Sequence, residues 1–439
     1  MVVQTYLSGT TAVKIAASVE AAVAAGTIAA GDRLPPVRDL AQHLGVSPAT
    51  VAASYRILHE RGIAFAEGRR GTIIRPASPS SPPVPIPLPP NVRDLASGNP
   101  AADLLPNLAP FLRKLDGSPR LYRDELNDPE LVALARKQFD ADGVPSSSVA
   151  VVSGALDGIE RVLREQLRSG DRVLVEDPCF TGVADLLHAL ALVPVPVSVD
   201  DEGLIPAAVQ RASSAAAIIV TPRAQNPTGA AFTERRGRQL RAILRQRPEL
   251  LIIEDDHAGP IAGAPYVTLV DGSRERWAVV RSVSKSLGPD LRVAIMAGDA
   301  RTIARVEGRQ TLGIRWVSHI LQRLIVALWR DKNVHKQLAR ADRTYTQRRD
   351  ALIDALRTHN ITAHGSSGLN VWIPLPEESA VIQSLFQRGW AVAAGERYRM
   401  KTGPAIRVTT ASLDDADAHK FADDLAQVLR PSQRQASGS

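Results

Sequence analysis

The feature that most restricts the fold of this chain is a proline-rich segment, PASPSSPPVPIPLPP, at residues 76–90. Proline fixes φ and lacks a backbone N–H, so such a segment cannot hold a helix or join a sheet. We expect an extended spacer rather than a ligand for a proline-recognising domain. The sequence therefore predicts a head at residues 1–76, a linker at 77–92 and a body at 93–430. The polar tail at 431–439 is expected to be disordered.

The head has the pattern of a helix-turn-helix. Residues 11–25 have the apolar spacing of a helix, and Pro35 and Pro36 open a second helix that runs to Leu44. Ser47 can cap a third helix, because its hydroxyl accepts an N–H group of the first turn. Two short strands around a basic turn follow at 62–76, as in a wing. A helix of this kind fits the major groove of DNA, whereas the alternative is a helical hairpin without nucleic acid.

The charge of the chain is densest in this head. Residues 1–76 hold eight Lys/Arg and five Asp/Glu, so they carry +3 of the total +7. This charge permits an anionic partner such as double-stranded DNA.

The head resembles the GntR-type winged helix-turn-helix, through GDRLPPVRDLAQHLGVSPATVAASYRILHERG and the wing EGRRGT. The resemblance implies a DNA-reading head under the control of a separate effector domain. The family's DNA contacts correspond here to Arg38, Ser47, Ala49, Thr50, Arg69, Arg70, Gly71 and Thr72. The chain departs from the family at Pro48 and Ala52, where arginines are common.

The body alternates short apolar runs with helical stretches, for example AAAIIVTP, ELLIIEDD and WAVVRSVSK. Apolar strands with intervening helices predict an α/β fold with a parallel sheet covered on both faces. Ligands of such sheets bind at the carboxyl ends of the strands.

Several chemically suggestive residues follow these apolar runs. Lys285, among serines at 281–292, suits a lysine that reacts with the aldehyde of pyridoxal phosphate. A carboxylate beneath the cofactor would hold its pyridine nitrogen protonated, and Asp255 is preferred to Asp256 for this role. A metal site or a solvated strand end is the alternative at IIEDDH. Asn226 lies in an Asn-Pro-Thr-Gly turn, and Phe180 can stack on the ring.

The order of these motifs resembles the fold-type I aminotransferases across nearly all of residues 93–430, with a mainly parallel seven-stranded sheet and a small C-terminal α/β domain. With the head in front, the chain is similar to the MocR subfamily of regulators, and most to members linked to pyridoxal salvage. The resemblance implies pyridoxal 5'-phosphate on Lys285, with Asp255, Asn226 and Phe180 around its ring. It implies a phosphate cradle of Ser153, Gly154, Ala155, Ser282, Ser284 and Arg292. Tyr122 would reach the phosphate of the partner subunit in a homodimer, and Arg407 would bind an effector carboxylate.

Two positions depart from the aminotransferase pattern. His257 and Phe180 stand where tyrosines are common, and imidazole can titrate near neutral pH. We therefore expect a transcription regulator that senses pyridoxal phosphate, a related vitamer or an amino acid. The alternatives are an active aminotransferase with an accessory domain and a helical appendage for protein contacts.

The remaining features concern the compartment. Cys179 is the only cysteine, so the chain can form no internal disulfide, and a reducing compartment fits. The N-terminus lacks the pattern of a signal peptide, and no apolar run reaches membrane-spanning length. We expect a cytoplasmic protein that binds no metal.

Overall fold

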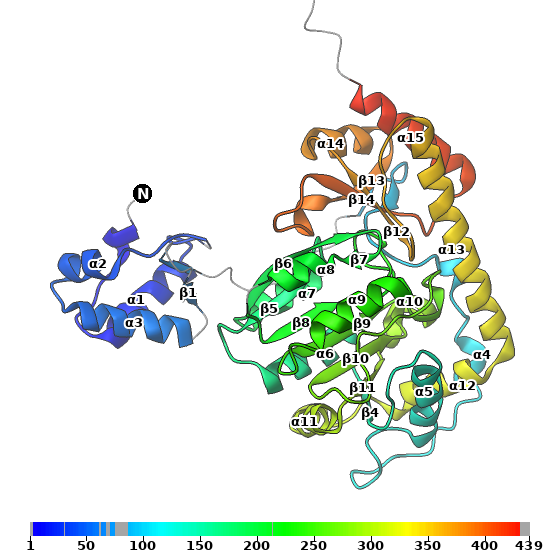
Figure 1. Cartoon of the computed structure of the whole chain (residues 1–439), viewed down its shortest axis with the longest axis horizontal. Helices are drawn as coiled ribbons and strands as arrows, with labels where there is room; N and C mark the ends of the chain where they lie inside the picture. The colour runs from blue at the N-terminus through cyan, green and yellow to red at the C-terminus, as the bar shows by residue number, and fades with distance from the viewer. Residues whose placement is uncertain are drawn as a thin grey trace, which may run out of the picture. The chain divides into compact units, whose positions relative to one another are not determined.

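The computed structural model describes residues 3–29, 31–60, 63–66, 71–74, 87–212 and 214–430. The chain separates into two compact units, one built mainly from residues before Pro85 and one mainly from residues after it (Figure 1). No helix in the described ranges has both the length and the apolar character required to cross a bilayer.

The first unit contains the predicted helix-turn-helix. Its elements are η1 (Val3–Tyr6), α1 (Ala12–Ala24), α2 (Val37–Leu44), α3 (Pro48–Glu60), β1 (Ala64–Ala66) and β2 (Thr72–Ile74). Gly45 ends α2 with φ of 65°, a left-handed conformation that favours glycine. Ser47 accepts the Thr50 N–H at 3.2 Å, which confirms the predicted cap of α3. Ile15, Leu40 and Val51 are fully buried among these elements, and β1 pairs antiparallel with β2.

The second unit is built on a mixed sheet with the strand order β4-β11-β10-β9-β8-β5-β6-β7. Neighbours from β10 through β9 and β8 to β5 are parallel, and β11 runs antiparallel to both of its neighbours. The strands are β4 (Val149–Val152), β5 (Arg172–Asp177), β6 (Val193–Asp200), β7 (Gly203–Leu204), β8 (Ala217–Val220), β9 (Leu251–Asp256), β10 (Trp277–Ser282) and β11 (Ala294–Gly298). The predicted sheet had seven strands, and the short β7, which folds back on β6, adds an eighth.

Every residue of β8, β9, β10 and β11 is buried, as expected for a sheet covered on both faces. The accompanying helices are α4 (Ala109–Leu112), α5 (Pro129–Ala141), α6 (Ala155–Gln166), α7 (Thr181–Ala189), α8 (Pro206–Arg211), α9 (Glu234–Leu244), α10 (Ser284–Leu287), α11 (Ala300–Thr311) and α12 (His319–Arg330). Short 3₁₀ turns are η3 (Ala102–Leu104), η4 (Gly259–Ile261) and η5 (Pro289–Leu291).

A smaller sheet completes the second unit, with the order β12-β14-β13-β3. Its elements are β3 (Arg93–Leu95), β12 (Asn370–Pro374), β13 (Trp390–Ala394), η6 (Gly395–Arg397) and β14 (Ala405–Thr409), with α14 (Ser379–Gln387) and α15 (Asp415–Leu429). The long α13 (Lys332–Thr358) precedes β12 in the chain and packs on α15 (Figure 1). β3 is the first strand after the linker, so the start of the body belongs to the small sheet.

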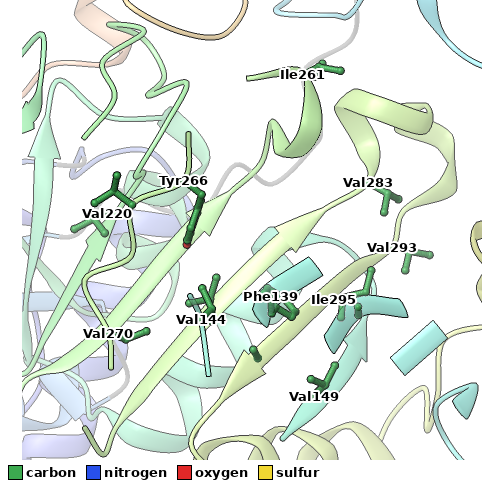
Figure 2. Packing of buried hydrophobic residues seen from close by; sticks show 14 of the residues in the cluster. Phe139, Val144, Val149, Val220, Ile261, Tyr266, Val270, Val283, Val293 and Ile295 are labelled. Atoms are coloured by element: carbon green, nitrogen blue, oxygen red, sulfur yellow. The ribbon is translucent and has the colours of Figure 1, made fainter. Parts of the chain in front are cut away.

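The core of the large sheet fixes the turn between β10 and β11. Figure 2 shows Val283 before α10, Val293 just before β11 and Ile295 within β11, among the buried side chains of this core. Phe139 of α5 belongs to the same cluster. Because both ends of the 284–292 segment are anchored in a close-packed interior, its polar side chains have defined positions.

Asp177, at the end of β5, ties the large sheet to the segment that joins β13 to β14. Its buried carboxylate accepts the backbone N–H groups of Met400, Lys401 and Thr402 at 2.7, 2.9 and 3.0 Å. The Thr402 hydroxyl donates to the Asp177 carbonyl at 3.0 Å. The Asp177 side chain therefore satisfies three backbone donors of the segment between β13 and β14.

Asp177→Asn should destabilise the protein by about 2–4 kcal/mol, because an amide offers one acceptor oxygen in place of a charged carboxylate and leaves donors unsatisfied. Urea denaturation of the full chain measures this free energy of unfolding. Asp185→Asn, at an exposed position of α7, is the control and should change it by less than about 0.5 kcal/mol. Equal stability of the two variants would contradict the role of Asp177.

Candidate functional site

A cavity of about 270 Å³ lies at the carboxyl ends of the strands of the large sheet. The predicted residues that line it are Ala155, Phe180, Asn226, Asp255, His257, Ser282, Ser284, Lys285, Arg292 and Arg407. The structure thus brings together side chains from segments that are more than 200 residues apart in the sequence.

Lys285 is the second residue of α10, in the turn that follows β10. Its Nζ donates a hydrogen bond to the Gly98 carbonyl at 2.5 Å. Burial, and then the positive charge of Arg407, lower the pKa of Lys285 to about 8. A larger neutral fraction than an ordinary lysine has at neutral pH makes this amine a better nucleophile.

The two aspartates at the end of β9 have different surroundings. Asp256 receives both Nε and Nη2 of Arg223 at 2.9 Å, and Nε of Arg281 at 2.6 Å. These arginines outweigh its burial and hold the pKa of Asp256 far below its usual range. The Asp256 carboxylate is therefore already paired with two arginines inside the protein.

Asp255 has no such partner. Its Oδ1 is buried and makes no hydrogen bond, and the residue lines the cavity. Burial, with the nearby charges of Asp256 and Glu176, raises the pKa of Asp255 to about 7. A cationic N–H donor in the cavity would satisfy this carboxylate, and the protonated pyridine nitrogen of pyridoxal phosphate is such a donor. The preference for Asp255 over Asp256 agrees with this geometry.

Groups that can donate to a phosphate also line the cavity. Ser284 Oγ is buried without a hydrogen-bond partner, and Arg292 lines the same space. Gly154, with φ of +106°, makes room for Arg292, because a Cβ there would stand 2.9 Å from its Nη2. Ala155 begins α6, whose N-terminus favours anions. Ser153 is not among the lining residues, and its N–H is bonded to Asp157 at 3.0 Å.

The remaining lining groups differ in charge and polarity. Asn226 Oδ1 accepts from Arg407 Nη1 at 3.3 Å, and Phe180 presents an apolar ring to the cavity. An imidazole can titrate near neutral pH, but at His257 burial, and then the charge of Lys285, lower the pKa to about 4. With this pKa the imidazole is neutral at physiological pH.

Arg407, on β14, is the second cation of the cavity. Nη2 donates to the Ala96 carbonyl, and the guanidinium stacks 5.1 Å from the Tyr398 ring centroid. Nε is buried without a partner, and burial is the main cause of its lowered pKa. A fixed guanidinium of this kind can bind a carboxylate through two parallel hydrogen bonds.

Tyr122 lies outside this cavity. Its side chain is 76% exposed and contacts Trp316 edge-to-face at 5.8 Å. A role at the cavity of the same chain is therefore not supported.

The predicted DNA contacts lie on the first unit. Arg38 on α2 and Ser47 and Ala49 at the start of α3 are exposed, while Thr50 is half-buried. Gly71 is exposed and Thr72 begins β2. Arg69 and Arg70 lie outside the described residues.

Sequence reasoning missed nine of the lining residues. Four of them lie close to predicted residues in the sequence, namely Leu156, Ala224, Ala258 and Pro289. Thr221 follows β8 and obeys the same strand-end rule as the residues that were found. The other four come from the small sheet, where that rule gives no signal: Ser97 and Gly98 follow β3, and Leu369 and Asn370 lie at the start of β12. Within the described segments, no cluster of three or more His, Cys, Asp or Glu side chains is arranged to hold a metal ion.

Comparisons with known proteins agree with both units. The family model for aminotransferase class I and II matches residues 91–425, and the model for bacterial regulatory proteins of the gntR family matches residues 11–74. The chain resembles the α-aminoadipate aminotransferase LysN of Thermus thermophilus in complex with N-(5'-phosphopyridoxyl)-L-leucine, with a TM-score of 0.68. That similarity covers 77% of this chain and 92% of the other at 21% identity, so it concerns the fold alone.

Two regulators are similar over most of their length. The vitamin B6 salvage pathway transcriptional repressor PtsJ of Salmonella typhimurium is 39% identical over 96% of this chain and 99% of its own. The pyridoxine biosynthesis transcriptional regulator PdxR of Corynebacterium glutamicum is 26% identical over 87% of each chain. The chain therefore belongs to the MocR-type regulators, in which a gntR-family head is joined to an aminotransferase class I and II body.

Proposed function

We propose that this protein is a DNA-binding transcription regulator whose body binds pyridoxal 5'-phosphate at Lys285 and thereby senses vitamin B6 status. The observation that carries the proposal is the buried, unpartnered Asp255 carboxylate in a cavity with a lysine of lowered pKa, on a chain with a gntR-type head. The names of the related regulators, which refer to vitamin B6 salvage and pyridoxine biosynthesis, support the same effector.

Each part of the cofactor has a matching group in the cavity. Lys285 would supply the amine, and Asp255 would share a proton with the ring nitrogen. Ser284 and Arg292 would donate to the phosphate, together with Ser282 and the N-terminus of α6. Phe180 would stack on the ring, and Asn226 would bind the phenolate oxygen. When bound, pyridoxal phosphate supplies an aldehyde and an electron-withdrawing ring.

An active aminotransferase is the second candidate, and Arg407 is the observation that favours it. A carboxylate-binding arginine beside Lys285 would suit an amino acid, which could also be an effector of the regulator. His257 argues for sensing, because a neutral imidazole replaces the acidic hydroxyl that the aminotransferase resemblance leads us to expect. Single-turnover mixing with amino acids would reveal any half-reaction.

We also propose a homodimer that acts in the cytoplasm. Leu121 and Tyr122 are 70% and 76% exposed, and Leu312, Ile314 and Ile320 are further large apolar residues on the surface. Covering such residues with a second copy would remove apolar area from water and could bring Tyr122 to the partner's phosphate site. Two heads would then read paired half-sites on DNA.

Lys285→Ala should abolish the visible absorption band that wild-type protein develops with pyridoxal phosphate, because the variant has no amine at the aldehyde. Absorption spectroscopy of the purified full chain measures this band. Arg168→Ala, outside the cavity, should leave it intact. An unchanged band in Lys285→Ala would overturn the cofactor assignment.

Capture of pyridoxal phosphate should become faster with rising pH and level off above about 8, where Lys285 is mostly neutral. Arg407→Gln removes a positive charge that lowers this pKa, so the midpoint should move to higher pH. Stopped-flow absorption across a pH series gives both profiles. A midpoint unmoved in Arg407→Gln would contradict the electrostatic role of Arg407.

The protein should bind the DNA upstream of its own gene with an affinity that falls as salt rises. Arg38→Ala should weaken binding and reduce the slope of log affinity against log salt by about 1. Fluorescence anisotropy measures both, and Lys137→Ala, on the surface of the body, should match wild type. Folded protein that fails to bind at low salt would exclude the regulator.

A further inference from the structure

The turn at residues 96–98 is held by two cationic side chains of the cavity, Lys285 and Arg407. Lys285 Nζ donates to the Gly98 carbonyl at 2.5 Å, and Arg407 Nη2 donates to the Ala96 carbonyl. Gly98 has φ of +71°, and a Cβ there would lie 3.4 Å from both terminal nitrogens of Arg407. The backbone of this turn is therefore in direct contact with the two side chains to which the cofactor and a carboxylate effector are assigned.

The turn is fixed to β3. Asp94 Oδ1 accepts the N–H groups of Ala96 and Ser97 at 2.8 and 2.9 Å, which closes a tight turn directly after the strand. β3 pairs in parallel with β13, from Arg93 opposite Trp390 to Leu95 opposite Val392. The Leu95 side chain is fully buried. The turn is therefore joined directly to a paired and buried strand of the small sheet.

β3 is also the first element of the body after the linker. Residues 87–92, the end of the linker, lead directly to Arg93 of β3. The Arg93 N–H donates to the Gly389 carbonyl at 2.8 Å. In the sequence, the linker precedes this strand directly and the head precedes the linker. Residues 96–98 are therefore the first part of the body, counted from the head, that contacts the cavity.

A ligand at Lys285 or Arg407 would compete with the carbonyl groups of the turn for the hydrogen bonds that these two side chains donate. Condensation of the Lys285 amine with the aldehyde of pyridoxal phosphate forms a C=N bond, breaks the C=O bond, releases one water and leaves at most one hydrogen on Nζ. The nitrogen then has fewer hydrogens to donate to Gly98. A ligand carboxylate at Arg407 would likewise compete with the Ala96 carbonyl.

We propose that the 96–98 turn is the element through which ligand binding at Lys285 and Arg407 is passed to the DNA-binding head. This inference rests on the proposed function, because it requires a cofactor at Lys285 and DNA at the head. Ligand binding releases the turn, the change moves β3, and β3 moves the end of the linker.

Hydrogen exchange of the full chain tests the first step. With pyridoxal phosphate, amides of residues 93–98 should exchange about 2- to 10-fold faster, the effect of losing one ordinary hydrogen bond. Inorganic phosphate, which has no aldehyde, should cause no change. If the visible band shows that Lys285 is occupied but the exchange of residues 93–98 is unchanged, the inference is overturned and the proposed function stands. Absence of that band would overturn the proposed function, and the inference with it.

Asp94 variants test the connection to DNA. Asp94→Ala removes the acceptor that closes the turn but retains Lys285, Asp255 and Arg292, so pyridoxal phosphate should still bind. The ratio of DNA affinities with and without pyridoxal phosphate should fall toward 1. Asp94→Asn retains an acceptor oxygen and should keep the wild-type ratio, which separates the turn from the charge of Asp94. A full response in Asp94→Ala, or a wild-type ratio of 1, would overturn the inference.

Discussion

The site depends on how β9 distributes three consecutive buried acids, Glu254, Asp255 and Asp256. Successive side chains of a strand point to opposite faces, so Glu254 and Asp256 share one face and Asp255 has the other. Glu254 accepts from the Tyr266 hydroxyl at 2.5 Å and from Thr268, and Asp256 is held by two arginines. The protein itself satisfies both acids of the first face. Asp255 alone is left for a group from outside the chain.

The ion cluster around Asp256 makes this arrangement possible. A buried guanidinium without a partner is costly, and Arg223 and Arg281 are both nearly fully buried. Arg281 also bonds Asp142 at 2.6 Å and lies over the Phe139 ring, so β10 is fixed to α5 as well as to β9. The turn that carries Lys285 begins where β10 ends. The same cluster therefore compensates the charge of Asp256 and anchors the strand that leads to Lys285, which lines the same cavity as Asp255.

Sequence reasoning could identify Lys285, Asp255 and Asn226 because strand ends in a parallel sheet converge on one edge. Ser97, Gly98 and Asn370 could not be identified in this way, because the small sheet brings them in from distant parts of the chain. The neutral state of His257 could not be predicted from the sequence for a related reason, since its pKa depends on burial and on the charge of Lys285. Local pattern thus predicts which residues end the strands, whereas burial and charge coupling follow from the tertiary structure.

The hydrogen bonds at the 96–98 turn also limit how strongly a ligand could control the head. One ordinary hydrogen bond contributes about 0.5–1.5 kcal/mol, so the two bonds from Lys285 and Arg407 amount to about 1–3 kcal/mol. Coupling free energies between allosteric sites are of this size and correspond to about 5- to 150-fold changes in affinity. A ligand at Lys285 alone would use about half of that energy. A second ligand group at Arg407 would therefore be required for the full response, which gives a carboxylate effector a physical role beyond recognition.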